Sequence, residues 1–202
     1  MAKTDKFEET IHKNLKQYLS GTGQIDDRLP ECPDVTDRWP AIGNSYIPDG
    51  AREYRDYPVA SLGWMMYIGM AVAKYWDEEC QWHSIASRSV ASGAKPSGEQ
   101  NDGSIYSQIE DLYLYMRDKR GYDALDEYIC EEVLMVRGEA AERLSQVVGE
   151  CAARVNADLM REQIEPGTKE AFDADVTCLR QLYLFGMDMQ LKRMGYHMER
   201  IG

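Results

Sequence analysis

The stretch from Pro58 to Ala73, PVASLGWMMYIGMAVA, contains no charged residue, although charged side chains make up 29% of the chain. Drawn as a helix, it has no polar face, and such a helix lies either in a protein core or in a membrane. A membrane span needs about 20 apolar residues, whereas this stretch is shorter and is followed by Lys74 and by the acidic run Asp77–Glu79. We therefore predict a core helix over about 58–82, with partner helices on every side.

Two glycines, Gly63 and Gly69, interrupt this apolar stretch. Glycine lowers helix propensity by roughly 1 kcal/mol relative to alanine, so its presence in a helix needs a reason. Because glycine has no side chain, we expect neighbouring helices to approach the backbone closely at these positions. The partners are either other helices of the same chain or helices of a second subunit.

Length and charge limit the classes of protein to consider. A chain of 202 residues can bury its own core, which indicates a single helical domain over residues 1–202. The net charge of -12 argues against duplex nucleic acid or an anionic membrane as a partner, since both bind basic surfaces. The segment MAKTDKFEET is charged and lacks the apolar centre of a signal peptide, which predicts a cytoplasmic location. The five cysteines form no CxxC pair, which favours reduced, structural thiols.

The N-terminal part of the chain divides into a predicted helix and a Pro-rich segment. Residues 1–20 are predicted to form a helix, from about Thr4 to Ser20, that ends at the glycines after it. Its apolar face consists of Phe7, Ile11, Leu15 and Leu19. Between residues 21 and 57 prolines are frequent and no helical period is visible. We predict an ordered, extended, Pro-rich strap over 21–57, in which Asn44–Ile47 resembles a short edge strand.

The remainder, residues 58–202, is predicted to be a helical bundle. Residues 84–103 are small and polar and include Pro96 and several glycines, which predicts a flexible loop. Further helices are expected over about Ser104–Arg120, Asp123–Met135 and Glu139–Gln163, and a last one capped by Thr168 and ending near Met194. The predicted fold is all-α, a bundle of about six helices around the apolar helix.

Carboxylate and histidine spacings raise one candidate metal site. Glu79 and His83 are four residues apart and share a face if the helix continues that far, and Asp77 lies nearby. These side chains can bind a divalent metal. The alternative, which we favour, is a solvated acidic rim where the helix leaves the core, because only one element supplies ligands. No motif implies a cofactor.

No catalytic residue is predicted, because GxSxG, HExxH, P-loop and GxGxxG motifs are all absent from the sequence. Aromatic residues crowd the strap and the apolar helix instead. A candidate ligand-binding pocket under the strap consists of Trp39, Tyr54, Arg55, Trp64 and Tyr67. The alternative is packing or a protein interface, where aromatic side chains are also frequent.

A family resemblance rests on three segments, YPVASLGWMMYIGMAVAKYWDEE (Tyr57–Glu79), MRDKRGYDALDEYICEEVL (Met116–Leu134) and REQIEPGTKEAF (Arg161–Phe172). In these segments the chain resembles an uncharacterised family of helical bacterial proteins to which no activity is assigned. The resemblance extends from about Tyr57 to the C-terminus. It implies a helical fold and a prokaryotic, cytoplasmic setting, and it identifies no functional residue.

Three functional hypotheses follow from the sequence. The first is a binding or protein-interaction module that self-associates as a dimer, which would explain the apolar helix, its small residues and the aromatic strap. The second is an enzyme or small-molecule-binding protein with a pocket under the strap. The third is a divalent-metal site at Asp77, Glu79 and His83. The absence of any catalytic motif favours a protein that is not an enzyme.

Overall fold

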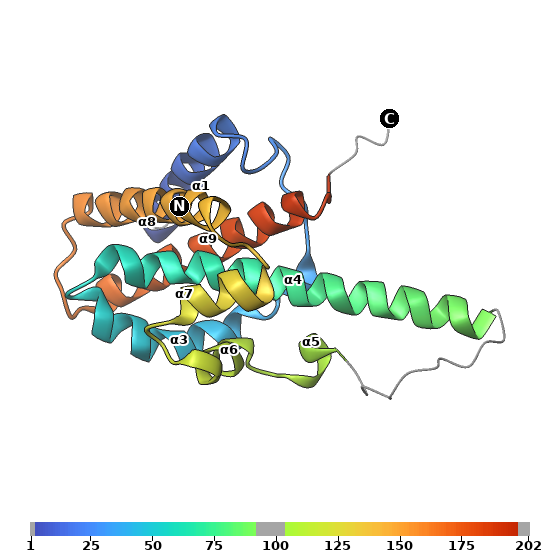
Figure 1. Cartoon of the computed structure of the whole chain (residues 1–202). Coiled ribbons are helices and arrows are strands. Elements are labelled where there is room, and N and C mark those ends of the chain that lie inside the picture. Colours follow the sequence, from blue (N-terminus) through green and yellow to red (C-terminus); the bar gives the residue numbers. More distant parts are fainter. Residues whose placement is uncertain (1–2, 92–103, 198–202) are drawn as a thin grey trace.

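The computed structural model describes residues 3–91 and 104–197, with side chains described over 5–84 and 104–197. Within these ranges the regular structure is helical and contains no strand, which confirms the predicted all-α class (Figure 1). The elements are α1 (Lys3–Gly21), α2 (Pro33–Thr36), α3 (Trp39–Tyr54), α4 (Pro58–Ala91), α5 (Ile105–Gln108), α6 (Leu112–Arg120), α7 (Leu125–Tyr128), the π-helix η1 (Ile129–Val133), α8 (Glu139–Arg161) and α9 (Lys169–Arg193). None of the described helices combines the length and apolar character needed to cross a lipid bilayer.

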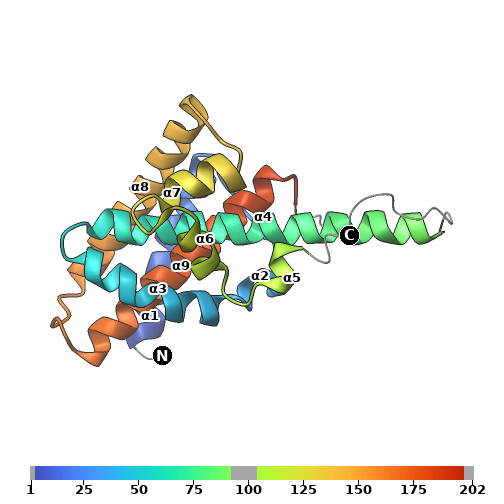
Figure 2. The ribbon, with the colours of Figure 1, turned by 60° about the horizontal axis from the view of Figure 1, so that its bottom comes forward.

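The core is centred on the contact between α4 and α9, which is the most extensive contact between two described elements. Figure 2 shows α9 crossing α4 in the middle of the body. Every residue of α4 from 65 to 73 is buried, and so is every residue of α9 from 185 to 191. Such all-round burial is achieved because α1, α3 and α8 cover the remaining sides of the pair.

Reciprocal glycines allow this crossing. A Cβ atom built on Gly69 would lie 2.1 Å from the carbonyl oxygen of Tyr183, and one built on Gly186 would lie 2.1 Å from that of Met66. Each glycine therefore faces the backbone of the opposite helix, and no side chain fits between them. The predicted close approach at Gly69 is confirmed, whereas Gly63 faces side-chain atoms and no backbone, the nearest being Cγ1 of Val148 at 3.1 Å.

Amphipathic helices cover this core in the way the sequence indicates. The predicted apolar face of α1 is buried in full, with Phe7 5% exposed and Ile11, Leu15 and Leu19 completely shielded. On α8 the buried residues repeat with helical spacing, at Leu144, Val148, Cys151 and Val155. α9 begins after Thr168, whose hydroxyl accepts a hydrogen bond from the backbone N–H of Ala171, as predicted.

The prediction of an extended strap over 21–57 is wrong for most of its length. Residues 33–36 and 39–54 are helical, and the suggested edge strand at Asn44–Ile47 lies inside α3. Pro40 occupies the first turn of α3, where its missing N–H costs nothing. Pro48 lies inside the helix, where it removes a hydrogen bond at a cost of about 3 kcal/mol. Packing offsets that cost, because the hydroxyl of the fully buried Tyr46 donates to the carbonyl oxygen of Ser61 on α4.

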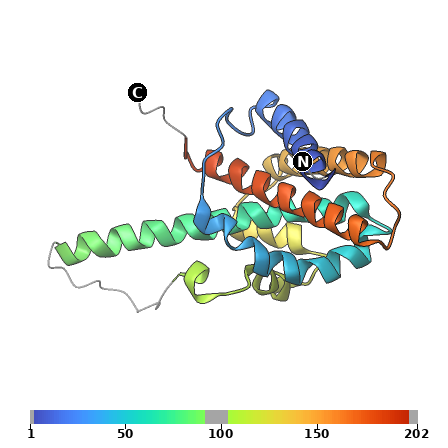
Figure 3. The same ribbon diagram turned by 180° about the vertical axis from the view of Figure 1, so that it is seen from behind.

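The apolar helix continues beyond its predicted end near residue 82, because α4 extends to Ala91. Residues 84–91 were therefore wrongly predicted as loop, and 92–103 lie outside the described residues. The sequence from Ser84 to Ala91 contains neither proline nor glycine, so nothing local stops the helix. In Figure 3 the C-terminal half of α4 extends past the other long helices.

Two further predicted helices are broken. The chain is extended at Ile109, which separates α5 from α6, and the Asp111 carboxylate caps α6 by accepting from the N–H of Leu114 at 3.0 Å. A competing N-cap of this kind starts a new helix. The predicted helix Asp123–Met135 is replaced by the short α7, with Ala124 as its N-cap, and by the π-helix η1.

Two carboxyl groups of α9 are shielded from water, Asp188 almost completely and Asp175 in part. Asp188 is 3% exposed, and its Oδ1 has no hydrogen-bond partner among the described residues. Burial raises the pKa of this carboxyl to about 8, although Lys16 acts in the opposite direction. Burial likewise raises the pKa of Asp175 to about 6. At neutral pH the folded chain therefore holds a protonated Asp188, whereas the same carboxyl is ionised in the unfolded chain. The free energy of unfolding is for this reason lower at neutral pH than at acidic pH.

Candidate functional site

Three of the five predicted ligand-binding residues lie apart from the others. Trp39 begins α3 and packs on Tyr183, with ring centroids 5.6 Å apart. Tyr54 ends the same helix of 16 residues, and its hydroxyl donates to Oδ1 of Asn156 over 2.8 Å. Arg55 follows, with a side chain that is 89% exposed. The structure thus gathers only the remaining two predicted residues, which lie on α4, into one site.

The predicted metal residues also separate. Asp77 and Glu79 are two positions apart on α4, so their side chains leave the helix in nearly opposite directions. Asp77 is buried and accepts hydrogen bonds from Gln81 and Tyr196, both at 2.8 Å. His83 pairs with Glu79 at 3.4 Å between Nε2 and Oε1. Among the residues with described side chains, no group of three metal-ligating side chains is placed to hold a metal ion.

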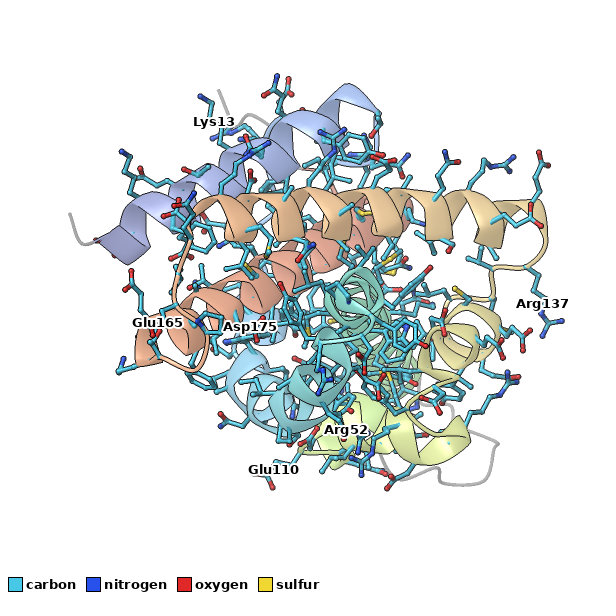
Figure 4. All side chains as sticks on the ribbon, turned by 90° about the vertical axis from the view of Figure 1, so that its left-hand side faces the viewer. Lys13, Arg52, Glu110, Arg137, Glu165 and Asp175 are labelled. Carbon is cyan, nitrogen blue, oxygen red and sulfur yellow. The ribbon has the colours of Figure 1, made fainter. Side chains whose placement is uncertain are left out.

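The two remaining residues, Trp64 and Tyr67, lie in a groove between α4 and α8. The groove consists of two adjoining depressions of about 420 and 350 Å³, which share Tyr67, Asp126 and Ser145. The first lies between the start of α4 and the middle of α8. The second lies between α7, η1 and the first turns of α8. Figure 4 looks along α4, with α8 passing across it and η1 at its side. We call these two depressions together the α4–α8 groove.

Small residues create the groove. Ala141, Ser145 and Gly149 recur every four residues on the face of α8 that lines it. A Cβ atom added to Gly149 would meet nothing within 4 Å. On α4 the lining includes Ala60 and Gly63. Because these positions carry small side chains or none, they leave space between the two helices above the aromatic residues of α4.

The floor of the groove is aromatic and apolar. Trp64 packs edge-on against Tyr122, with ring centroids 4.3 Å apart, and Tyr67 is only 4% exposed. Burial raises the pKa of the Tyr67 hydroxyl well above its usual value, while hydrogen bonding to Ser145 has the opposite effect. The floor therefore stays uncharged across physiological pH, and it offers apolar surface with one fixed hydroxyl.

The chemistry of the groove suits binding. Its thiol, Cys130, has a pKa raised to about 11, chiefly because the thiol is buried. A thiol of this kind is protonated at neutral pH and is a poor nucleophile. No histidine lines either depression. The arrangement thus supplies contact surface and charge, and it does not supply an activated nucleophile with a base.

Acidic residues surround the second depression. Its lining includes Asp126, Glu127, Glu131 and Glu142. Glu131 is neutralised by Arg120, at 2.8 Å between Nη1 and Oε2. Asp126 and Glu142 form no ion pair with any residue whose side chain is described. The basic residue of this rim, Arg137, extends away from the body in Figure 4.

Another hollow, larger than either depression alone, is a weaker candidate than the groove. It measures about 550 Å³ and lies between α1 and α8. Its central carboxylate, Asp158, already accepts hydrogen bonds from Asn14 at 2.7 Å and from Arg161 at 2.6 Å. Arg154 lies over the Tyr18 ring at 4.4 Å from the ring centroid. Because these polar groups satisfy one another, the hollow presents few unmet interactions to a ligand.

Sequence reasoning identified Trp64 and Tyr67 but missed Asp126, Ser145 and Glu142. The sequence does contain one indication of this part of the groove. Ala141, Ser145 and Gly149 are spaced by four, which shows that one face of α8 carries only small residues at these positions. The partner of that face is set by how α8 packs on α4, which no local pattern reveals.

No protein-family model, no curated protein and no solved structure matches this chain. The resemblance to a family of helical bacterial proteins therefore stays a prediction.

Proposed function

We propose that this chain is a binding module that holds a segment of another protein in the α4–α8 groove. One observation supports this proposal above the others. The groove combines an aromatic, apolar floor, at Trp64 and Tyr67, with two carboxylates, Asp126 and Glu142, that have no ion-pair partner among the described side chains. Protein interfaces typically have an apolar centre and a polar rim of this kind.

The shape of the groove favours a protein segment over a small molecule. Pockets for small ligands enclose most of the ligand surface, whereas both depressions here are open to solvent. The lining follows α8 from its N-cap, Gly138, to Gly149, which corresponds to about 17 Å along the helix axis. An elongated groove between two helices suits a segment that lies along it.

The rest of the fold supports this role as a scaffold. We interpret the architecture as a bundle built around α4, in which the glycine crossing with α9 fixes α4 and α8 packs on its other side. A groove between rigid helices loses little conformational entropy when a partner binds. A cytoplasmic location is part of the same proposal.

Site-specific photo-crosslinking tests the proposal. A photoreactive phenylalanine analogue replaces Ser145, at the centre of the groove, or Gln146, which is exposed on the same helix and outside the lining. We expect a crosslinked protein in the cells that produce the chain from position 145 and not from 146. That protein, once identified and purified, should bind Ser145→Trp about tenfold more weakly than the wild type, whereas Gln146→Trp binds normally. Equal binding by both variants would contradict the proposal.

Self-association is a second candidate function, supported by exposed apolar side chains at one end of the body. Tyr57 is 65% exposed, Met160 68% and Phe172 52%. They come from the α3–α4 turn, the end of α8 and the start of α9, which lie at the same end in Figure 1 and Figure 3. Native mass spectrometry at micromolar concentration decides the question, since a monomer would exclude a stable dimer.

A further inference from the structure

We infer that the occupant of the α4–α8 groove is a cationic amphipathic helix of a partner protein. This inference rests on the proposed function and adds the chemistry of the partner. In the inferred complex, the apolar side of the partner helix contacts Val59 and Trp64, which are both partly exposed in the first depression. Its lysine or arginine side chains lie over Asp126 and Glu142.

The apolar side of the partner follows from the first depression. This part of the groove is lined by Val59, Gly63, Trp64 and Val148, and the exposed ring of Tyr57 lies at its end. Polar lining residues, Asp126 and Ser145, lie only where the first depression meets the second. A partner that fills this part with apolar side chains removes aromatic and aliphatic surface from water.

The positive charge of the partner follows from the second depression. Asp126, Glu127 and Glu142 face this hollow, whereas the charge of Glu131 is already met by Arg120. Arg137 also lines this hollow, with its side chain extending outward (Figure 4), so acidic groups outnumber basic ones in the lining. An acidic partner would place like charges together, and that includes a second copy of this chain, whose net charge is -12. A basic partner is attracted and is steered toward the groove before contact.

The helical form of the partner follows from the length of the groove and from its division into an apolar and an acidic depression. About 17 Å of helix corresponds to roughly three turns. A helix of this length presents anchors at positions i, i+3 or i+4, and i+7 along one face. Its apolar residues can occupy one depression while basic residues on the flank reach the rim of the other.

Three synthetic peptides of about 15 residues, or four helical turns, test the inference with the purified full chain. The first is an amphipathic helix with leucine on one face and lysine on the other. The second replaces each lysine by glutamate. The third contains the residues of the first in an order that is not amphipathic, so that it reports attraction by charge alone. Affinities are measured by isothermal titration calorimetry at near-physiological salt.

Two neutralised variants separate the groove from the general acidity of the chain. Asp126→Asn with Glu142→Gln removes the two rim charges. Glu139→Gln with Glu150→Gln removes the same charge from α8 outside the lining, where both glutamates form only surface ion pairs. Such surface pairs contribute little to stability, so both variants should fold.

The expected result is binding of the lysine peptide alone. Its affinity should fall about tenfold in the Asp126→Asn/Glu142→Gln variant, as expected for two exposed charge pairs, and should not change in the control variant. Ser145→Trp should abolish binding.

Other outcomes overturn the inference in distinguishable ways. Failure of the lysine peptide to bind, equal binding by the glutamate or non-amphipathic peptide, or equal loss in both neutralised variants rejects a cationic helix. None of these affects the crosslinking result at position 145. Lysine-peptide binding that Ser145→Trp leaves unchanged places the peptide elsewhere and rejects the inference too. The proposed function fails separately, if the crosslinked partner binds Ser145→Trp and Gln146→Trp equally.

Discussion

Replacement of Gly69 or Gly186 by alanine tests the α4–α9 crossing that supports the whole fold. Each added Cβ atom would lie 2.1 Å from a backbone carbonyl oxygen of the opposite helix. No side-chain rotation relieves such a contact, so the helices must separate by roughly 1 Å. A gap of that size forfeits a quarter to a half of the dispersion energy of the contacts it opens. We expect each substitution to lower the free energy of unfolding by about 3 kcal/mol, at the upper end of the usual cost of overpacking.

Gly149→Ala is the matched control for these substitutions. Gly149 lies inside α8, and an added Cβ atom would meet nothing within 4 Å. Alanine there should raise the free energy of unfolding by about 0.5–1 kcal/mol, because alanine is the better helix former. The same chemical change is therefore expected to have opposite signs on α4 and α8.

Urea denaturation followed by circular dichroism measures the difference, and thermal melts provide a check. For a chain of this size, a loss of about 3 kcal/mol lowers the melting temperature by about 6–12 °C. The double variant Gly69→Ala/Gly186→Ala should lose less than the two single losses added together, because the first alanine already separates the helices. If Gly69→Ala and Gly149→Ala change stability in the same direction, the reasoning from backbone contact is wrong.

Two further predictions concern stability. Burial raises the pKa of Asp188 from its usual 3.8 to about 8, so the folded chain binds a proton more tightly than the unfolded chain. Wild-type stability should therefore fall as pH rises between these values. Asp188→Asn removes this dependence and should be the more stable protein at pH 7, by up to a few kcal/mol; parallel urea curves for the two proteins from pH 4 to 9 would refute the assignment. Asp111→Ala removes the N-cap of α6 and should cost about 1–2 kcal/mol, whereas Asp118→Ala, at a side chain that is 73% exposed, should have almost no effect. Equal melting temperatures for the two variants would show that the Asp111 cap does not contribute.

The elements predicted well from the sequence are those whose own residues decide their structure. The first helix has a regular apolar face, and α9 has a threonine cap and is preceded by a Pro-Gly turn. Gly69 was predicted to allow close helix contact because glycine in an otherwise favourable helix needs a reason. In each case the local pattern and the tertiary packing agree.

The elements predicted poorly depend on contacts that are distant in the sequence. α3 contains two prolines and still forms a helix, because Tyr46 and Gly50 each share a hydrogen bond with Ser61 of α4. The π-helix η1 ends just before Met135, whose positive φ turns the chain toward α8. Neither feature has a reliable local signature.

The candidate site shows the same division. Trp64 and Tyr67 were recognised because aromatic residues on an apolar helix are conspicuous. Asp126 and Ser145 were missed because they become part of a groove only when α7 and α8 pack beside α4. The groove itself results from small side chains. Such residues occur throughout the sequence, so their type alone does not show where a groove will form.

Hydrogen–deuterium exchange with the leucine–lysine peptide shows directly whether the α4–α8 groove binds a cationic helix. We predict that added peptide slows exchange at amides of α4 and α8 that line the groove, around Trp64–Tyr67 and Ala141–Gly149. A second acidic hollow, lined by Glu8, Glu9 and His12 on α1, serves as the internal comparison and should show no change. Slower exchange at α1, or at both hollows equally, would show that the peptide follows negative charge and not the α4–α8 groove.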